Sequence, residues 1–160
     1  MSRAFVVRPA RDEDRRPAAL VYAAVAEERT GIAGEPPVDV ERRAASFDLD
    51  GSFAAVAGDE LVGWLHVEAL WFGVGELGML VAHDWRGRGV GSALLEAAIE
   101  WARERELHKL SLGVFTHNEP AIALYRKFGF VEEGRRVKHF RRANGELWDA
   151  FEMGLLLRPD

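Results

Sequence analysis

The sequence predicts an α/β fold, with a mixed, mostly antiparallel seven-stranded sheet flanked by about four helices. Two pairs of strand-like runs are joined by hairpin turns, at Gly58-Asp59 and at Asn144-Gly145. Between these pairs, an apolar run leads through a glycine-rich turn into an amphipathic helix and then into another apolar run. Because neighbouring parallel strands need such a crossover, this segment adds one parallel pair to an otherwise antiparallel sheet.

The composition is that of an ordinary globular protein. The 160 residues, 48% hydrophobic and 29% charged, fit a single domain covering residues 1–160. The apolar runs are far shorter than a bilayer span, and the start of the chain lacks the apolar segment of a signal peptide. We therefore expect a cytoplasmic protein with no membrane contact. The net charge of −5 argues against a nucleic-acid partner.

The amino-terminal part predicts one strand and two helices. Residues 4–8 form a strand-like run that Pro9 ends. Helical spacing covers residues 18–29, and a second short helix is expected over residues 39–47. The segment between these helices, residues 30–38, contains two glycines and a Pro-Pro pair, so it is a loop.

The rest of the chain supplies six strands and two helices. Apolar residues at helical spacing after the glycine turn predict a helix that packs on the sheet and fixes the turn at the end of the preceding strand. A shorter helix starts at Pro120 and ends at Gly129. The strands are expected over residues 52–57, 60–71, 76–82, 109–115, 134–141 and 147–156, and the longer helix over residues 90–104.

The glycine-rich turn has the features of an anion site. Its glycines alternate with larger residues, so the backbone can take left-handed angles and approach a ligand closely. The amide groups of the turn are also the unpaired donors of the following helix, where the dipole favours negative charge. This pattern predicts a cradle for a pyrophosphate, formed by Arg86, Gly87, Arg88, Gly89, Val90, Gly91 and Ser92.

Two common nucleotide-binding patterns do not fit this turn. Ser92 stands where a dinucleotide fingerprint has its third glycine, and the next strand ends in Thr116, His117 and Asn118 instead of an acid. No Lys-Ser or Lys-Thr pair follows the glycines, which argues against a P-loop. Taken alone, a short glycine turn is explained more readily as a structural turn than as a ligand site.

A second motif, NEPAIALYRKFGF, runs from Asn118 to Phe130. Together with the glycine turn it closely resembles the GCN5-related N-acetyltransferase (GNAT) superfamily, over residues 61–157 and in that family's order and spacing. The resemblance implies the acyl-CoA N-acyltransferase fold, in which the strand before the glycine turn separates from the next parallel strand and acetyl-CoA enters between them. The final hairpin also resembles a branch that includes bacterial amino-acid, polyamine and ribosomal-protein N-acetyltransferases.

The resemblance implies roles for further residues. A main-chain N–H at a bulge near Leu80 and Val81 would stabilise the oxyanion, and Tyr125 would be the general acid for the leaving thiolate. Tyr125 also shares an apolar helical face with residues three and four positions away, which points the phenol inward; the alternative is a boundary tyrosine with its hydroxyl in water. Asn118 is expected to contact the pantetheine amides or to cap the helix.

Acetyl transfer to an amine also needs a group that takes the proton of the ammonium form. Glu76 is the candidate base, since an acid needs a reason within the apolar run that leads to the cradle. A solvent-facing residue at the strand start, beside Gly75, explains this acid equally well, and a chain of water molecules is another route for the proton.

Missing residue types exclude other chemistry. The chain has no cysteine, which excludes disulfides, thiolate metal ligands and a cysteine acyl-enzyme, so transfer must be direct or use another nucleophile. The five histidines show no metal-ligand spacing, so no metal is expected.

These features predict an acetyl-CoA-dependent N-acetyltransferase that acetylates, through a ternary complex, a primary amine of a small molecule such as an amino acid, or of a peptide. A polyamine or ribosomal-protein acceptor is an alternative, as is a CoA-binding regulatory or interaction module without turnover. Formation of a homodimer is left open.

Two groups of residues bear on the acceptor. Trp64, Trp71 and Trp148 either line an acceptor pocket or belong to the core. Basic residues of the last hairpin either stay in water at the sheet edge, which explains most of them better, or one or two pair with an acceptor carboxylate. Strand alternation places Arg136 and Lys138 on one face and Arg135 on the other. The basic residues are Arg135, Arg136, Lys138, Arg141 and Arg142.

Overall fold

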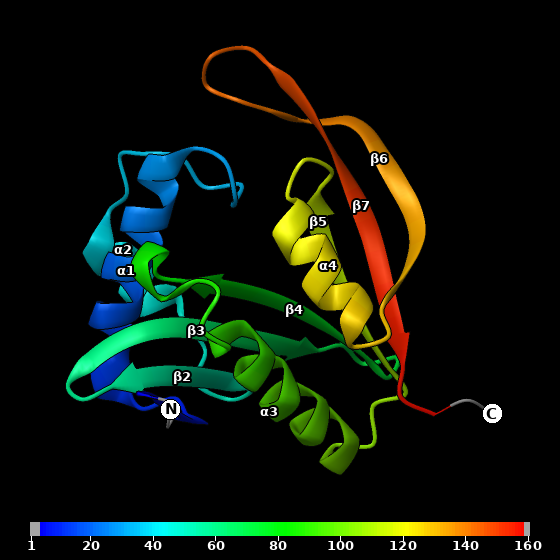
Figure 1. Cartoon of the computed structure of the whole chain (residues 1–160), viewed down its shortest axis with the longest axis horizontal. Helices are drawn as coiled ribbons and strands as arrows, with labels where there is room; N and C mark the ends of the chain where they lie inside the picture. Colours follow the sequence, from blue (N-terminus) through cyan, green and yellow to red (C-terminus); the bar gives the residue numbers. More distant parts are fainter. Residues whose placement is uncertain (1–3, 159–160) are drawn as a thin grey trace.

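The computed structural model describes residues 4–158 and confirms the predicted α/β class. Seven strands form one mixed sheet in the order β1-β2-β3-β4-β5-β7-β6, and within the described residues only β4 and β5 pair in parallel (Figure 1). The strands are β1 (Val6–Pro9), β2 (Ser52–Ala57), β3 (Glu60–Ala69), β4 (Val74–Val81), β5 (Lys109–Phe115), β6 (Val131–Arg141) and β7 (Leu147–Leu156).

Four α-helices cover the two faces of this sheet (Figure 1). On one face lie α3 (Val90–Glu104) and α4 (Glu119–Lys127), and on the other lie α1 (Arg15–Glu28) and α2 (Val40–Ser46). Two short 3-10 helices, η1 (Asp12–Asp14) and η2 (His83–Trp85), precede α1 and the glycine turn. None of the helices in the described part is long and apolar enough to cross a membrane.

The core on the α3 face explains why α3 runs along the sheet. Its buried residues follow helical spacing from Val90 through Leu94 to Ala98, and they pack on the middle strands. Gly63 in β3 leaves room for this crossing, because a Cβ there would lie 2.8 Å from Val90 Cγ1. The packing fixes the start of α3, and with it the glycine turn, at the end of β4.

The α1 face has a smaller core that includes Ala18 of α1 and Trp64 of β3, and Phe47 packs against it through the Trp64 ring. A side-chain hydrogen bond from Arg15 to the main-chain oxygen of Phe47 joins α1 to the end of α2. The start of α1 is fixed by an ion pair between Arg8 and the buried Asp14, whose oxygens lie 2.6 and 3.0 Å from the guanidinium. These contacts hold α1 and α2 over the same part of the sheet.

Strands β4 and β5 pair over only three residues each. The pairing joins residues 74–76 to residues 109–111, after which the two strands separate (Figure 1). Each keeps its other neighbour, because β4 stays paired with β3 to Val81 and β5 stays paired with β7 to Phe115. The sheet is therefore split at its centre, as the family resemblance implied.

Several predicted ends shift by a few residues. β3 stops at Ala69, and Trp71 and Phe72 form an exposed turn, with 93% and 51% of their surfaces accessible. β1 includes Pro9 because it is an edge strand, where a missing N–H costs no sheet hydrogen bond. β6 begins at Val131, three residues earlier than predicted.

Candidate functional site

A cavity of about 1430 Å³ lies where β4 and β5 separate. Residues 77–81 and 111–115 of the two strands line it, together with the glycine turn and α4. Its other walls come from α1, α2 and the loop between them, so the cavity reaches both faces of the sheet. One space thus connects the predicted cradle to the α1 and α2 side.

Main-chain groups of β4 are open toward the split. Hydrogen bonds from Leu70 N to Val74 O and from Ala82 N to Val62 O lie at the two ends of the β3–β4 pairing, which runs between them without a shift. Because hydrogen-bonded pairs alternate along antiparallel strands, the odd-numbered residues of β4, including Met79 and Val81, direct their N–H groups toward the split.

This pattern changes one expectation. The pairing of β3 with β4 contains no bulge, so the bulge expected near Leu80 and Val81 was wrong. Leu80 lies opposite Trp64 in a hydrogen-bonded pair, which occupies its amide. An open amide therefore arises at Val81 because β4 has lost its β5 neighbour, and at Met79 for the same reason.

The glycine turn has the backbone that an anion cradle requires. Gly87 and Gly89 have φ values of 74° and 87°, and Gly89 precedes α3 without any side-chain cap on the helix. The first amides of α3, those of Val90, Gly91 and Ser92, therefore keep free donors. A Cβ at Gly87 or Gly89 would meet no atom within 4 Å, so the turn is open on its outer side.

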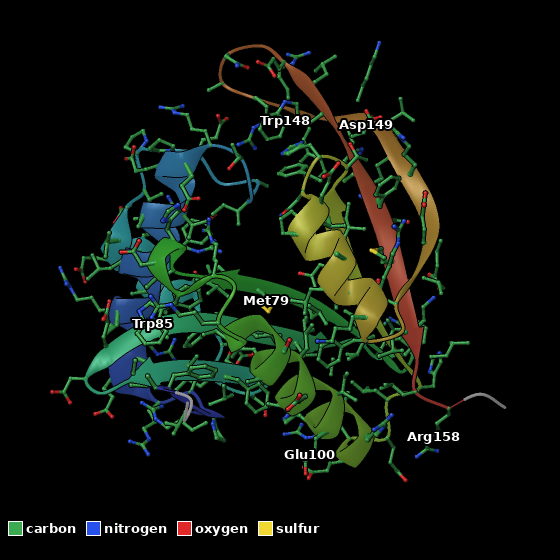
Figure 2. The ribbon with its side chains drawn as sticks, in the orientation of Figure 1. Met79, Trp85, Glu100, Trp148, Asp149 and Arg158 are labelled. Carbon is green, nitrogen blue, oxygen red and sulfur yellow. The ribbon has the colours of Figure 1, made fainter. Side chains whose placement is uncertain are left out.

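Gly91 is needed for a different reason, which is the close packing of α3. A Cβ there would lie 2.9 Å from Leu124 Cδ2 of α4 and 3.4 Å from Met79 Cε. Figure 2 shows Met79 beside the start of α3. Gly91 therefore lets α3 approach both α4 and β4, and a side chain at this position would push the helices apart.

The two arginines of the turn have other partners. The guanidinium of Arg86 binds the carboxylate of Glu28 at 2.6 and 2.8 Å, and its Nε donates to Val81 O at 3.1 Å. Arg88 lies over the Trp85 ring, 4.9 Å from its centroid. Contact of either side chain with a pyrophosphate thus stays a prediction, and for Arg86 it would compete with Glu28.

Tyr125 lines the cavity from α4 and is 7% exposed. Its ring packs edge-on against Phe130, and within residues 4–158 its hydroxyl has no hydrogen-bond partner. Burial raises the pKa of Tyr125 to about 12, because the phenolate is poorly solvated. The phenol is therefore protonated at neutral pH and free to donate a hydrogen bond into the cavity.

Asn118 and Glu76 also line the cavity. Asn118 Oδ1 accepts a hydrogen bond from Ala121 N at 3.4 Å, so it caps α4, and its amide nitrogen remains for another partner. Glu76 is exposed, at the last position where β4 pairs with β5, and it lies opposite Glu68 of β3. Both predicted roles, cofactor contact and base, stay predictions.

His66 also lines the cavity, and no sequence motif pointed to it. Its Nδ1 lies 2.7 Å from Ser52 Oγ, whose single proton is donated to the main-chain oxygen of Asp48. His66 therefore donates from Nδ1, and in the neutral ring Nε2 is the acceptor. The hairpin signal alone does not give this pairing, because it depends on the register shift between Ala55 and Val56.

The basic hairpin is mostly paired within the protein. Arg135 binds Asp149 and Arg136 binds Glu152, each at 2.6 Å. The hydrogen bond from Lys138 N, followed by the one from Arg135, lowers the pKa of Asp149. Contact of Arg135 or Arg136 with an acceptor stays a prediction, and both side chains would first have to leave these partners.

Arg142 differs from the other arginines of the hairpin because it is 4% exposed. It donates to the main-chain oxygens of Ala33 and Ile32 at 3.0 and 3.4 Å, and stacks 4.2 Å from the Trp148 ring centroid. This cation joins the last hairpin to the loop between α1 and α2. Trp148 belongs to this contact, Trp64 lies in the core at the cavity wall, and Trp71 points into solvent.

No group of three histidine, aspartate or glutamate residues in the described chain is arranged to hold a metal ion. That no metal takes part in the reaction stays a prediction.

Comparison with known proteins gives a consistent result. A family model described as "Acetyltransferase (GNAT) family" matches residues 18–130. The L-amino acid N-acetyltransferase AaaT of Escherichia coli is 42% identical over 84 residues, which cover 50% of this chain and 49% of that protein. The L-methionine sulfoximine/L-methionine sulfone acetyltransferase of Pseudomonas aeruginosa is 36% identical over 118 residues, which cover 66% of this chain and 68% of that protein. The match thus spans about half the length of the first relative.

Among solved structures, yncA from Salmonella typhimurium, with its cofactor acetyl-CoA, has a TM-score of 0.87 to this chain. The likeness covers 98% of this chain and 96% of that one, at 20% sequence identity, and it shows the fold. The family model reaches from α1 to the end of the second motif, and it includes the glycine turn, Glu76 and Tyr125. The chain therefore belongs to the GNAT family of acetyltransferases.

Proposed function

We propose that this chain is an acetyl-CoA-dependent N-acetyltransferase that acetylates a primary amine of a small molecule such as an amino acid, or of a peptide, directly in a ternary complex. The observation that carries the proposal is the split between β4 and β5. It gathers open amides of β4, open amides of α3 and the Tyr125 phenol around one cavity. The names of the relatives, which act on amino acids and their analogues, support this acceptor class.

The residues present fit acetyl-CoA, which supplies the acetyl group as a thioester. The amides of Val90, Gly91 and Ser92 would bind the pyrophosphate at the start of α3. The open amide of Val81, which is nearer to the glycine turn than Met79, and the side-chain nitrogen of Asn118 would bind the pantetheine amides. The acetyl-CoA in yncA, a protein of the same fold, supports this placement at the level of the fold.

Three groups would carry the chemistry. Glu76 takes the proton that makes the amine nucleophilic, directly or through water. The open N–H of Met79, which lies nearer to Glu76 than that of Val81, stabilises negative charge on the carbonyl oxygen, because it has no strand partner to compete for it. Tyr125 donates a hydrogen bond to the leaving sulfur, and its raised pKa keeps the phenol protonated. The single-domain organisation, the cytoplasmic location and the absence of a metal are parts of the same proposal.

The proposal is tested with purified protein and acetyl-CoA against a panel of amino acids, polyamines and amino-terminal peptides. Release of free CoA thiol is followed together with the mass of the acetylated product. We expect product formation with at least one primary amine and loss of most of the rate in Tyr125→Phe. Acetyl-CoA binding without any acetylated product would favour a CoA-binding regulatory module instead.

A further inference from the structure

Arg43 of α2 is the one partly buried arginine in residues 4–158 that has no acceptor for its side chain. Its guanidinium lies 3.8 Å from the centroid of the Tyr22 ring and 5.4 Å from that of Phe47. Other described arginines without a polar partner are exposed, so water can solvate them: Arg42, Arg88, Arg103, Arg126 and Arg141. The charge of Arg43 is instead held between aromatic rings at the wall of the cavity.

A second donor without an acceptor belongs to a side chain that packs against the same Phe47 ring. Trp64 Nε1 and Arg43 Nε are both buried, and within the described chain neither has a hydrogen-bond partner. Phe47 joins them, because its ring centroid lies 4.9 Å from that of Trp64. A buried donor without an acceptor is unfavourable, so two such donors around one aromatic ring indicate that an acceptor is supplied from elsewhere.

Arg142 gives the comparison within the same protein. Its Nε also lacks a partner, but its other nitrogens donate to the main-chain oxygens of Ala33 and Ile32. Arg142 is therefore accounted for by the loop that it holds. Arg43 lines the cavity and has no such contact with a main-chain oxygen.

The position of these donors relates them to the acceptor amine. Trp64 lies opposite Leu80, where β4 has already left β5, and the two side chains share the sheet face that carries Glu76. The glycine turn leads into α3 on the opposite face. A molecule between Arg43 and β4 would thus occupy the acceptor side and leave the cradle to the pyrophosphate.

The charge of the cavity selects the kind of anion. Glu76 and Glu68 both line it and have no ion-pair partner within residues 4–158, so a highly charged anion such as a phosphate would be repelled, whereas an ammonium group would be attracted. Arginine binds a carboxylate in a planar, two-point geometry. A polyamine would place a cation beside Arg43 and offer no oxygen to its donors.

We infer that Arg43, assisted by the Trp64 indole N–H, binds the carboxylate of the acceptor, and that the acceptor is an amino acid with an apolar side chain. Tyr22, Phe47 and Ile32 form the apolar wall against which that side chain packs. The inference rests on the proposed acetyltransferase function and names the acceptor class of the same site. It places the carboxylate at α2 and not at the basic hairpin.

The test compares L-leucine, L-methionine and L-phenylalanine with their carboxamides and with spermidine, in wild type and in Arg43→Met. We expect the wild type to prefer the acids. Arg43→Met should raise KM for the best acid roughly 10-fold to 100-fold, the usual scale for a charge-assisted hydrogen bond, with KM for its carboxamide unchanged. Arg43→Lys should fall between, because it keeps the charge and loses the two-point geometry.

Controls separate binding from folding. Arg42→Met, on the neighbouring exposed arginine, should leave both KM values unchanged. Trp64→Phe keeps the aromatic packing and removes one N–H, so it should raise KM for the acid several-fold even if Arg43→Met does not fold. Equal effects of Arg43→Met on acid and carboxamide, or spermidine as the best acceptor, would overturn this inference alone. A wild type that binds acetyl-CoA and acetylates no amine would overturn the proposed function and this inference with it.

Discussion

The Arg86 guanidinium binds the Glu28 carboxylate through two hydrogen bonds, at 2.6 and 2.8 Å, and so ties the glycine turn to the end of α1. The hydrogen bond from Arg86 lowers the pKa of Glu28, which keeps the pair ionised at neutral pH. Arg86 also covers the Val81 oxygen, one of the open groups of β4. A charge next to the cradle is therefore neutralised within the protein, and the amides of α3 are left as the main anion donors.

Replacing Glu28 should leave the Arg86 guanidinium without its carboxylate partner. We expect Glu28→Gln to tighten acetyl-CoA binding about 3-fold to 10-fold at low salt, because Arg86 can then face the pyrophosphate, and the gain should shrink as salt screens it. Arg86→Met should change the Kd by less than about 3-fold. Calorimetric titration at two salt concentrations measures both. A loss of more than 10-fold in Arg86→Met would instead show that Arg86 contacts the cofactor.

The cradle is tested at Gly89, whose φ of 87° is tolerated by asparagine and aspartate better than by other side chains. A side chain at Gly89 enters open space, whereas one at Gly91 would meet Leu124. Gly89→Asp and Gly89→Asn are nearly equal in size and differ in charge. We expect the aspartate variant to bind acetyl-CoA at least 10-fold more weakly than the asparagine variant. Equal affinities would argue against a pyrophosphate at this turn.

Tyr125→Phe should reduce kcat by roughly 100-fold or more while acetyl-CoA affinity changes little, since only the proton donor is removed. The pKa of about 12 also predicts that the phenol does not limit the rate on the alkaline side up to pH 10. Ultraviolet titration of wild type against Tyr125→Phe isolates this ionisation. Wild-type turnover in the variant would show that the thiolate leaves without a donor.

Glu76→Gln should lower kcat/KM roughly 100-fold at neutral pH, where the amine is mostly protonated. The deficit should narrow as the pH approaches the pKa of the amine, because the neutral nucleophile then forms without a base. Glu68→Gln is the matched control, since Glu68 lies directly opposite and lines the same cavity. A pH-independent deficit, or an equal loss in both variants, would mean that Glu76 is not the base.

Asp14 makes a prediction about stability. Burial alone would raise its pKa, but hydrogen bonds from the Arg8 guanidinium and from Arg11 N outweigh this, so the pKa is lowered. The ionised Asp14 carboxylate therefore stabilises the folded protein above its unfolded-state pKa near 4. This stabilisation is lost as the pH falls through the pKa of Asp14 in the folded protein. Asp14→Asn should lower the free energy of unfolding by about 2–4 kcal/mol at pH 7, because Arg8 loses its partner.

Urea unfolding at pH 7 and pH 3 measures the effect of Asp14→Asn, and the difference from wild type should narrow only at the lower pH. Asp12→Asn is the control, because Asp12 is paired with Arg15 but its side chain is 90% exposed. This variant should change the unfolding free energy by less than about 1 kcal/mol. A similar loss of unfolding free energy in both variants would show that the buried Asp14 stabilises the fold no more than the exposed Asp12 does.

The sequence by itself determined the elements and the two motifs. The spans 52–57, 90–104, 109–115 and 147–156 agree with the strands and helix of the structure. The glycines at 87 and 89 have the positive φ that the cradle required, and Asn118 caps α4. These features depend on local chemistry, on turn residues, caps and the period of apolar side chains, which neighbouring residues alone specify.

Tertiary structure decided which groups are paired and which are left free. Arg86 meets Glu28 across 58 positions of the chain and Arg142 meets Ala33 across 109, so no local pattern could assign either partner. The register shift between Arg136 and Phe140 interrupts the alternation of side chains that predicted Lys138 on the same sheet face as Arg136. The open amides of β4 exist because β5 diverges from β4. Arg43 lacks an acceptor because α1 and the end of α2 place the Tyr22 and Phe47 rings against its guanidinium. Whether a charged group or a hydrogen-bond donor has a partner depends on which groups lie near it in space, and tertiary packing determines those groups.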